Sequence, residues 1–234
     1  MYSYLEENIK SVKESIKSVC EKAGRPENSV TLLGVTKTYE ADVMNAAIGY
    51  GITDIAENKV QEILRKYDQV NRGVNWHLIG HLQSNKVKYI IDKVELIHSV
   101  DSLKLAIEIN KRAGQIHKIQ DVLIQINIQD EASKFGIPPE SLETLIKEIS
   151  DLKNIRVCGL MYIAPIVEQP DHLRDDFKLM KKMFDELKNS PYENVIPLHL
   201  SMGMSSDYEV AIEEGATMVR VGTRIFGKRQ YQTK

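Results

Sequence analysis

The chain has 234 residues, of which 42% are hydrophobic and 27% are charged, and its formal net charge is −2. This near-balance gives no support to a nucleic-acid or membrane-surface role, because such partners attract proteins with a marked basic excess. Cys20 and Cys158 lack metal-type spacing, and no apolar run approaches the ~20 residues of a membrane span. The N-terminus has acids where a signal peptide needs an apolar core, so we expect a cytoplasmic protein.

The first expected element is an amphipathic helix. Its apolar residues recur at alternating spacings of four and three, which places them in one stripe: Leu5, Ile9, Val12, Ile16 and Val19. Gly24 and Pro26 are typical of the end of such a helix. The stripe can pack on the rest of the chain or on a partner, and we expect a monomer.

Eight short apolar or β-branched runs follow, and we expect each to form a buried strand. They span residues 31–36, 52–56, 74–79, 94–100, 121–128, 155–163, 195–200 and 217–221. Segments of helical periodicity separate them; in one of these, the apolar stripe consists of Val60, Ile63, Leu64, Tyr67 and Val70. Continuous apolar runs alternating with helices indicate a parallel sheet covered on both faces.

The number of strands predicts the architecture. Eight strand–helix units fit a (β/α)8 TIM-type barrel, whose usual length is ~250 residues, with an additional N-terminal helix. A nine-strand open sheet is the alternative. No linker or change in composition divides the sequence, so we expect a single domain over residues 1–234.

A lysine, Lys37, follows the first strand directly. A lone lysine at a strand end usually extends to solvent. Barrels of this type, however, build their sites at the carboxyl ends of the strands, and other such ends here also carry polar, small or flexible side chains. These are Glu57-Asn58, Gly80-His81, Asn127, Met161, Ser201 and residues 220–223. Lys37 is therefore one member of a set.

Two late loops have the composition of phosphate cradles. Residues 200–207 lead into a helix N-terminus, with Gly203 allowing a ligand close to the backbone. Residues 219–227 supply Gly222 and the Thr223 hydroxyl. Each loop alone is also explained as a turn with a helix cap, but loops after strands seven and eight commonly hold phosphate in barrels. An amine facing a phosphate cradle predicts pyridoxal 5′-phosphate (PLP) bound as an imine to Lys37.

Several longer motifs occur along the chain. They are L-L-G-V-T-K (32–37), A-E-N-K-V-Q-E (56–62), W-H-L-I-G-H-L-Q-S-N-K (76–86), N-I-Q-D-E-A-S-K-F-G (127–136), G-L-M-Y-I-A-P (159–165), S-M-G-M-S-S-D (201–207) and V-R-V-G-T-R-I-F-G (219–227). In these motifs the sequence resembles the pyridoxal phosphate homeostasis proteins, PLP-binding barrels similar to the N-terminal domain of alanine racemase. The resemblance covers nearly the whole chain. Two departures are Ala56, where the family usually has glycine, and Lys59, where an aromatic residue is common.

The resemblance implies a role for each candidate residue. Lys37 would carry the aldimine, and Arg220 would face the pyridine nitrogen. The phosphate would be held by Ser201, Gly222 and Thr223, and the ring pocket would be lined by Asn58 and Met161.

The same resemblance implies a function in intracellular PLP (vitamin B6) homeostasis without robust catalysis. A cation at the ring nitrogen disfavours its protonation and weakens carbanion chemistry. The tyrosine that similar racemases take from a second domain is also not expected here. We expect PLP, and apo PLP-dependent enzymes that receive it, as partners. A racemase-like enzyme is the first alternative, and a PLP-free barrel that binds a phosphate ligand is the second.

His77 and His81 have the i, i+4 spacing of a zinc pair. They straddle a strand end rather than lying on a helix, and no third ligand accompanies them. We therefore expect no metal site.

Overall fold

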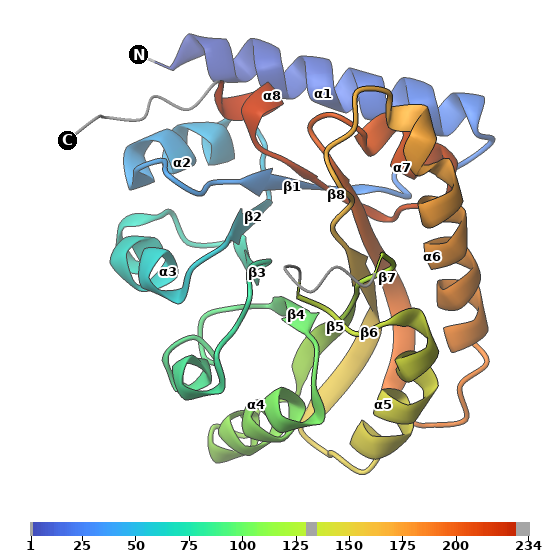
Figure 1. Cartoon of the computed structure of the whole chain (residues 1–234). Helices are drawn as coiled ribbons and strands as arrows, with labels where there is room; N and C mark the ends of the chain where they lie inside the picture. The colour runs from blue at the N-terminus through green and yellow to red at the C-terminus, as the bar shows by residue number, and fades with distance from the viewer. Residues whose placement is uncertain (1, 130–134, 228–234) are drawn as a thin grey trace.

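The structure of the protein is a computed structural model that describes residues 2–129 and 135–227. These residues form a closed barrel of eight parallel strands in sequential order, with β8 paired to β1 (Figure 1). The strands are β1 (Thr31–Val35), β2 (Asp54–Glu57), β3 (Asn75–Leu78), β4 (Leu96–Val100), β5 (Gln120–Ile126), β6 (Ile155–Tyr162), β7 (Val195–Met204) and β8 (Met218–Val221). The predicted (β/α)8 barrel is confirmed, and the open sheet is excluded. Residues 130–134, part of the 127–136 motif, lie outside the described residues.

Helices cover the outside of the barrel. They are α1 (Ser3–Lys22), α2 (Ala41–Gly49), α3 (Val60–Lys66), α4 (Leu103–Gln115), α5 (Leu142–Ile149), α6 (Arg174–Leu187), α7 (Tyr208–Glu213) and α8 (Thr223–Phe226). Short 3₁₀ helices add η1 (Tyr67–Gln69), η2 (Ser84–Tyr89), η3 (Pro139–Ser141) and η4 (Pro170–Leu173). The helix between β3 and β4 is thus a single 3₁₀ segment. Within the described residues, no helix has both the length and the apolar run that crossing a membrane requires.

The hydrophobic core has two parts. The larger lies between the strands and the helices, and the smaller contains only residues of strands and strand ends: Leu33, Val35, Ala56, Ile79, Leu96, Leu123, Cys158, Met161 and Met218. The smaller part fills the barrel interior, as in other barrels of this class. The barrel is therefore packed and has no open channel through this layer.

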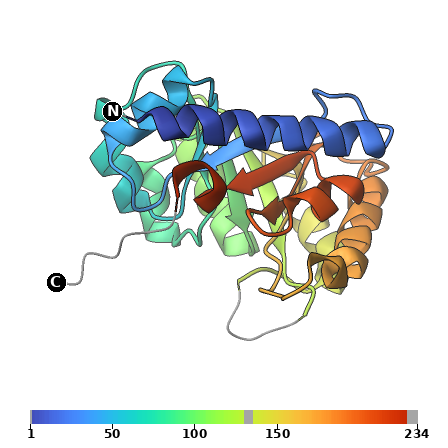
Figure 2. The ribbon, with the colours of Figure 1, turned by 90° about the horizontal axis from the view of Figure 1, so that it is seen from above.

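Helix α1 packs on the barrel of its own chain. Its predicted apolar stripe is buried, and the helix runs alongside α7 and α8 in two perpendicular views (Figures 1 and 2). Asn8 donates a hydrogen bond to the Ile225 carbonyl at 2.8 Å, and the Tyr208 hydroxyl donates to Ser15 at 3.0 Å. Of the two sequence-based alternatives for this stripe, packing on the chain itself is therefore confirmed.

The register of the first, second and eighth strands determines which residues meet at the rim. Val35 pairs with Ala56, and Gly34 pairs with Val221. Lys37 and Asn58, which follow the paired ends of β1 and β2, border the same two pockets, and Gly222 follows the end of β8 beside Val35. Strand-end residues that are far apart in sequence thus converge on one side of the barrel rim.

Candidate functional site

A pocket of about 630 Å³ opens at the carboxyl ends of the strands; we call it the rim pocket. It is lined by Val35, Lys37, Asn58, Ile79, Ile163, Ile166, Met204, Ser205, Ser206, Arg220, Gly222, Thr223 and Arg224. This volume is typical of small-molecule sites. The described lining residues include three cationic side chains and no carboxylate, so the pocket suits an anionic ligand.

Five of the seven predicted site residues line the rim pocket: Lys37, Asn58, Arg220, Gly222 and Thr223. The other two, Met161 and Ser201, are fully buried and are not among the lining residues. Met161 belongs to the hydrophobic cluster of the barrel interior. Ser201 lies below the rim because β7 does not end at Leu200, as predicted, but continues to Met204.

The loop after β7 therefore meets the pocket later in the sequence than predicted. Its lining residues are Met204, Ser205 and Ser206. Gly203, expected to let a ligand approach, serves helix packing instead, since a Cβ added there would lie 2.6 Å from the Ala211 Cβ. Its positive φ of +92° also requires glycine.

The two cradle loops are joined to each other. The Gly222 N–H donates to the Ser205 Oγ at 3.1 Å, and the Met204 N–H donates to the Asp207 Oδ1 at 2.7 Å. Within the described part of the chain, the backbone N–H groups of Ser206, Thr223 and Arg224 donate to no protein acceptor. Unpaired N–H groups beside one pocket are what an anionic oxygen ligand requires.

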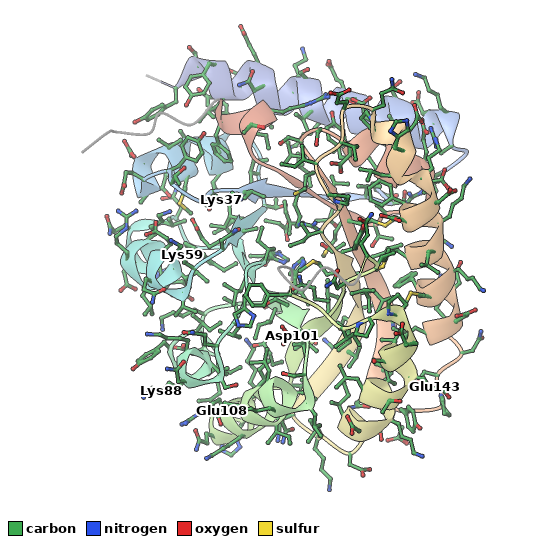
Figure 3. All side chains as sticks on the ribbon, viewed as in Figure 1. Lys37, Lys59, Lys88, Asp101, Glu108 and Glu143 are labelled. Atoms are coloured by element: carbon green, nitrogen blue, oxygen red, sulfur yellow. The ribbon has the colours of Figure 1, made fainter. Side chains whose placement is uncertain are left out.

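Lys37 lies two residues beyond β1 and is partly exposed. Figure 3 shows it on the same side of the barrel as Lys59, near β1 and α3. Beside Lys37, a buried cluster of Thr36, Glu57, Lys66 and Glu62 connects the ends of β1 and β2 with α3. The Thr36 hydroxyl and the Lys66 ammonium both donate to the Glu57 Oε1 at 2.8 Å, and Lys66 also pairs with the Glu62 carboxylate at 3.0 Å.

This cluster was not predicted, because Lys66 is a lysine that is fully buried on α3. Leu64, assigned to the apolar stripe of this helix, is 40% exposed, so that part of the stripe was wrong. Burial raises the pKa of Glu57, although the Lys66 charge opposes the shift. The ion pair joins the end of β2 to α3, and hydrogen bonds of Thr36 connect this pair to the end of β1, next to Lys37 and Asn58 in the sequence.

Asn58 is held in place by its contact with Gly80. A Cβ added at Gly80 would lie 2.1 Å from the Asn58 carbonyl oxygen, so only glycine fits there. The buried Asn58 Oδ1 has no hydrogen-bond partner among the described residues. Since buried polar atoms are nearly always paired, this atom is available to a donor group on a bound ligand.

Arg220 forms the charged floor of the rim pocket. Its Nη1 donates to the Ser201 Oγ at 2.8 Å, and its Nη2 donates to the Tyr162 carbonyl at 2.7 Å. Burial lowers the pKa of Arg220 to about 10, with a small opposing effect from Asp207. The guanidinium therefore remains a cation at neutral pH, held at a defined position.

Lys37 also borders a second pocket. This pocket has a volume of about 460 Å³ and is lined by Lys37, Thr38, Glu40, Glu57, Asn58, Lys59, Glu62 and Arg65. Most of its charges are already paired, for example Arg65 with both Glu40 and Glu62. A further pocket of about 590 Å³ lies between α5 and α6, and none of the predicted site residues lines it.

The two histidines with zinc-type spacing do not face each other. His77 bonds with Asp54 and His98 inside the barrel, whereas His81 stacks on Phe135 with ring centroids 3.8 Å apart. Among the described residues, no group of three or more His, Cys, Asp or Glu side chains could hold a metal ion.

Several lining residues were not singled out from sequence. Val35, Ile79 and Ile163 provide apolar walls, and Arg224 adds a cation. Val35 and Ile79 lie near the ends of predicted strands. Their position just before the polar strand-end residues could have identified them as pocket-lining residues. Ile166, which is 96% exposed, lies in a loop and offered no periodic signal.

A family model and a named relative both match nearly the whole chain. The sequence model described as "Alanine racemase, N-terminal domain" matches residues 8–230. A protein from Aquifex aeolicus named "Pyridoxal phosphate homeostasis protein" is 47% identical over 226 residues, covering 96% of this chain and 98% of the relative.

Solved structures agree with these matches. The structure of PipY from Synechococcus elongatus with PLP bound has a TM-score of 0.83 and 32% identity, covering 95% of this chain and 100% of that one. A protein from Bifidobacterium adolescentis has a TM-score of 0.91 and 35% identity, covering 96% and 95% of the two chains.

Proposed function

The chain belongs to the pyridoxal phosphate homeostasis protein family, and from this premise we propose that it binds PLP in the rim pocket through Lys37. The observation that supports this most directly is the shared lining of one pocket by Lys37, Gly222 and Thr223. The name of the relatives and the PLP in the PipY structure support the same ligand. The function is PLP homeostasis, in which the protein holds the cofactor rather than using it.

The phosphate side of the pocket is the pair of joined loops. The free N–H groups of Ser206, Thr223 and Arg224, with the Thr223 hydroxyl, would hold the phosphate oxygens. Because Ser201 lies below this level, we transfer its predicted phosphate role to Ser205 and Ser206. The positive charges of Lys37, Arg220 and Arg224 favour the dianion electrostatically.

The remaining lining residues suit the rest of PLP. When bound, PLP supplies an aldehyde that condenses with a primary amine, and Lys37 carries the amine in the rim pocket. Val35, Ile79 and Ile163 offer apolar surface to a ring. The free Asn58 Oδ1 would accept from a ring substituent.

A carrier role is supported by the charge at the pocket floor. Arg220 disfavours a proton on a pyridine nitrogen that faces it, so carbanion stabilisation would be weak. The described lining of the rim pocket also contains no His, Tyr, Cys or carboxylate that could act as a second acid–base group. The competing function is an amino-acid racemase, which requires such a group.

The proposal is tested by absorption spectroscopy of the purified protein. We expect a visible imine band that borohydride bleaches and that disappears in Lys37→Ala. Lys59→Ala is the matched control, because Lys59 lines the second pocket with Lys37 but not the rim pocket. A band that survives in Lys37→Ala would refute the attachment site.

Two further measurements separate the alternatives. Thr223→Val is expected to weaken PLP retention while the circular dichroism spectrum stays unchanged, and equal retention would contradict the phosphate assignment. Exchange of solvent deuterium into the α-carbon of alanine distinguishes a racemase from a carrier, and robust exchange would exclude the carrier function.

The assembly state and cellular setting are also proposed. The burial of the α1 stripe on its own barrel supports a monomer, and two buried free cysteines are compatible with the reducing cytoplasm. We propose apo PLP-dependent enzymes as recipients of the cofactor. Light scattering tests the monomer, and activation of an apo-enzyme by the loaded protein tests the transfer.

A further inference from the structure

A row of hydrogen-bonded polar side chains crosses the barrel interior below the rim pocket. Asp54 lies at the start of β2, His77 on β3, His98 on β4 and Ser201 on β7. Their exposed fractions are 8%, 2%, 0% and 0%, in a layer where apolar side chains are usual. We call these four residues the interior relay.

The contacts of the interior relay are continuous. His77 Nε2 lies 3.1 Å from the Asp54 Oδ1, and His77 Nδ1 lies 3.0 Å from the His98 Nε2. His98 Nδ1 lies 3.0 Å from the Ser201 Oγ, which in turn accepts from Arg220 at 2.8 Å. The chain of contacts therefore runs from the amino-terminal end of β2 to the floor of the rim pocket.

Arg220 at one end of the relay only donates hydrogen bonds, and the Asp54 carboxylate at the other end only accepts them. Together they determine which atom is the donor in each hydrogen bond between them. Arginine only donates, so the Ser201 oxygen accepts from it, and the serine hydroxyl hydrogen points to His98 Nδ1. His98 then carries its hydrogen on Nε2 and donates to His77 Nδ1. His77 donates from Nε2 to the Asp54 carboxylate, which only accepts when ionised.

The opposite direction leaves a buried donor unsatisfied. If His77 donated to His98, His98 would donate from Nδ1 to Ser201, whose oxygen already accepts from Arg220. The Ser201 hydroxyl hydrogen would then have no acceptor among the described residues. A buried unsatisfied donor is unfavourable, so the first direction is preferred.

We propose that Asp54, His77, His98 and Ser201 form a hydrogen-bonded relay of fixed direction that positions the Arg220 guanidinium at the floor of the rim pocket. Ser201 and His98 are then positioning residues and do not themselves contact the ligand. The relay concerns only side chains of this protein. Its use in holding a cation against a bound ring rests on the proposed PLP function.

The electrostatic surroundings agree with a neutral His98 imidazole near Arg220. Burial lowers the pKa of His98 well below its usual value, and the Arg220 charge adds to this. The pKa of Asp54 is lowered as well: burial alone would raise it, but hydrogen bonds from His77, Thr53 and Asn75 outweigh burial. The charged or titratable groups around these residues come from several strands: Asp54, Asp121, Arg156, His199 and Arg220.

The direction of the relay is measured by nuclear magnetic resonance on PLP-free, ¹⁵N-labelled protein. We expect a coupling across the hydrogen bond between His98 Nε2 and His77 Nδ1, with the hydrogen carried by His98. Because PLP is absent, this result is independent of whether the proposed function holds. A hydrogen on His77 Nδ1, or no coupling, would overturn the relay.

The positioning role is measured at the Arg220 guanidinium resonances. His77→Phe removes the acceptor for His98 Nε2, so we expect His98 to change tautomer and the Arg220 signals to shift. His199→Phe is the control, because His199 is a half-buried histidine of β7 that has no contact in the relay. Unchanged Arg220 signals in His77→Phe would overturn the positioning role.

A milder pair of variants gives the same test if His77→Phe does not fold. Ser201→Ala is expected to merge the resolved Arg220 Nη signals through faster rotation, because the Nη1 acceptor is lost. Ser201→Thr keeps the hydroxyl and is expected to restore separate signals. Equal Arg220 spectra for the alanine and threonine variants would contradict the proposal.

Discussion

Replacing Lys66 by methionine tests the buried cluster that joins β1 to β2. Lys66 is fully buried and pairs with Glu57 at 2.8 Å and with Glu62 at 3.0 Å. Without the ammonium, Glu57 keeps only the Thr36 hydroxyl on Oε1, while its Oε2 has no partner among the described residues. The variant thus leaves a buried carboxylate without a counter-charge.

The expected loss in free energy of unfolding is about 3–5 kcal/mol, the cost of breaking a buried ion pair by removing one partner. Glu57→Gln should cost less, about 1–3 kcal/mol, because Lys66 retains Glu62 and the amide can still accept from Thr36. The double variant should therefore be more stable than the sum of the two single losses predicts.

Urea unfolding followed by circular dichroism measures these differences. The control is Lys182→Met, which removes an exposed pair with Glu186 at 3.8 Å and should change stability by less than about 1 kcal/mol. A Lys66→Met variant as stable as this control, or additive losses in the double variant, would refute the role of the cluster.

The same cluster gives a pH dependence of known sign. The pKa of Glu57 is raised by burial, so the folded protein binds a proton more tightly than the unfolded chain does. Stability from this group is present at low pH and is lost as pH rises through the folded-state pKa. In Lys66→Met the opposing charge is absent, so the deficit relative to wild type should be smaller at pH 5 than at pH 8; an equal deficit at both would contradict this.

Three further predictions concern single sites. Gly80→Ala should lower stability by about 1–3 kcal/mol or more through its clash with the Asn58 carbonyl, and should weaken PLP retention; urea unfolding and absorbance measure both. Ser102→Ala removes the cap that accepts from the Leu105 N–H on α4 and should cost about 1 kcal/mol in urea unfolding, whereas no loss would discount the cap. The pKa of Cys158 is raised to about 12 by burial, so its thiol should react with a disulfide reagent at pH 8 only after unfolding, and rapid native reaction would contradict this.

The barrel was predictable because its signal is repeated. Each strand forms a short apolar run and each helix an apolar stripe, so an error at one element does not change the fold. The positions of strand ends were less certain, and this affected the site. The β7–β8 register shifts between Ser201 and Met204, which lengthens β7 beyond its apolar run. The sequence signal for this shift is Gly203, because a glycine inside a strand often marks a bulge, but it was interpreted as a point of ligand approach.

The sequence analysis also missed two buried polar residues, Lys66 and His98, for a physical reason. A lysine in a helix pattern predicts an exposed residue, and only its carboxylate partners explain why Lys66 is buried. His98 lies within an apolar run and gave no motif, although its partners His77 and Ser201 come from other strands. Interactions between distant strands become visible only once the barrel is closed.

The pairing of β8 with β1 has a consequence for how the protein is made. Lys37 leaves the ribosome well before Thr223, yet both line one pocket. A nascent chain therefore cannot offer the complete pocket until β8 has paired with β1. A ligand that bridges this seam would bind only molecules in which the barrel is closed, and its binding energy would oppose the reopening of the barrel.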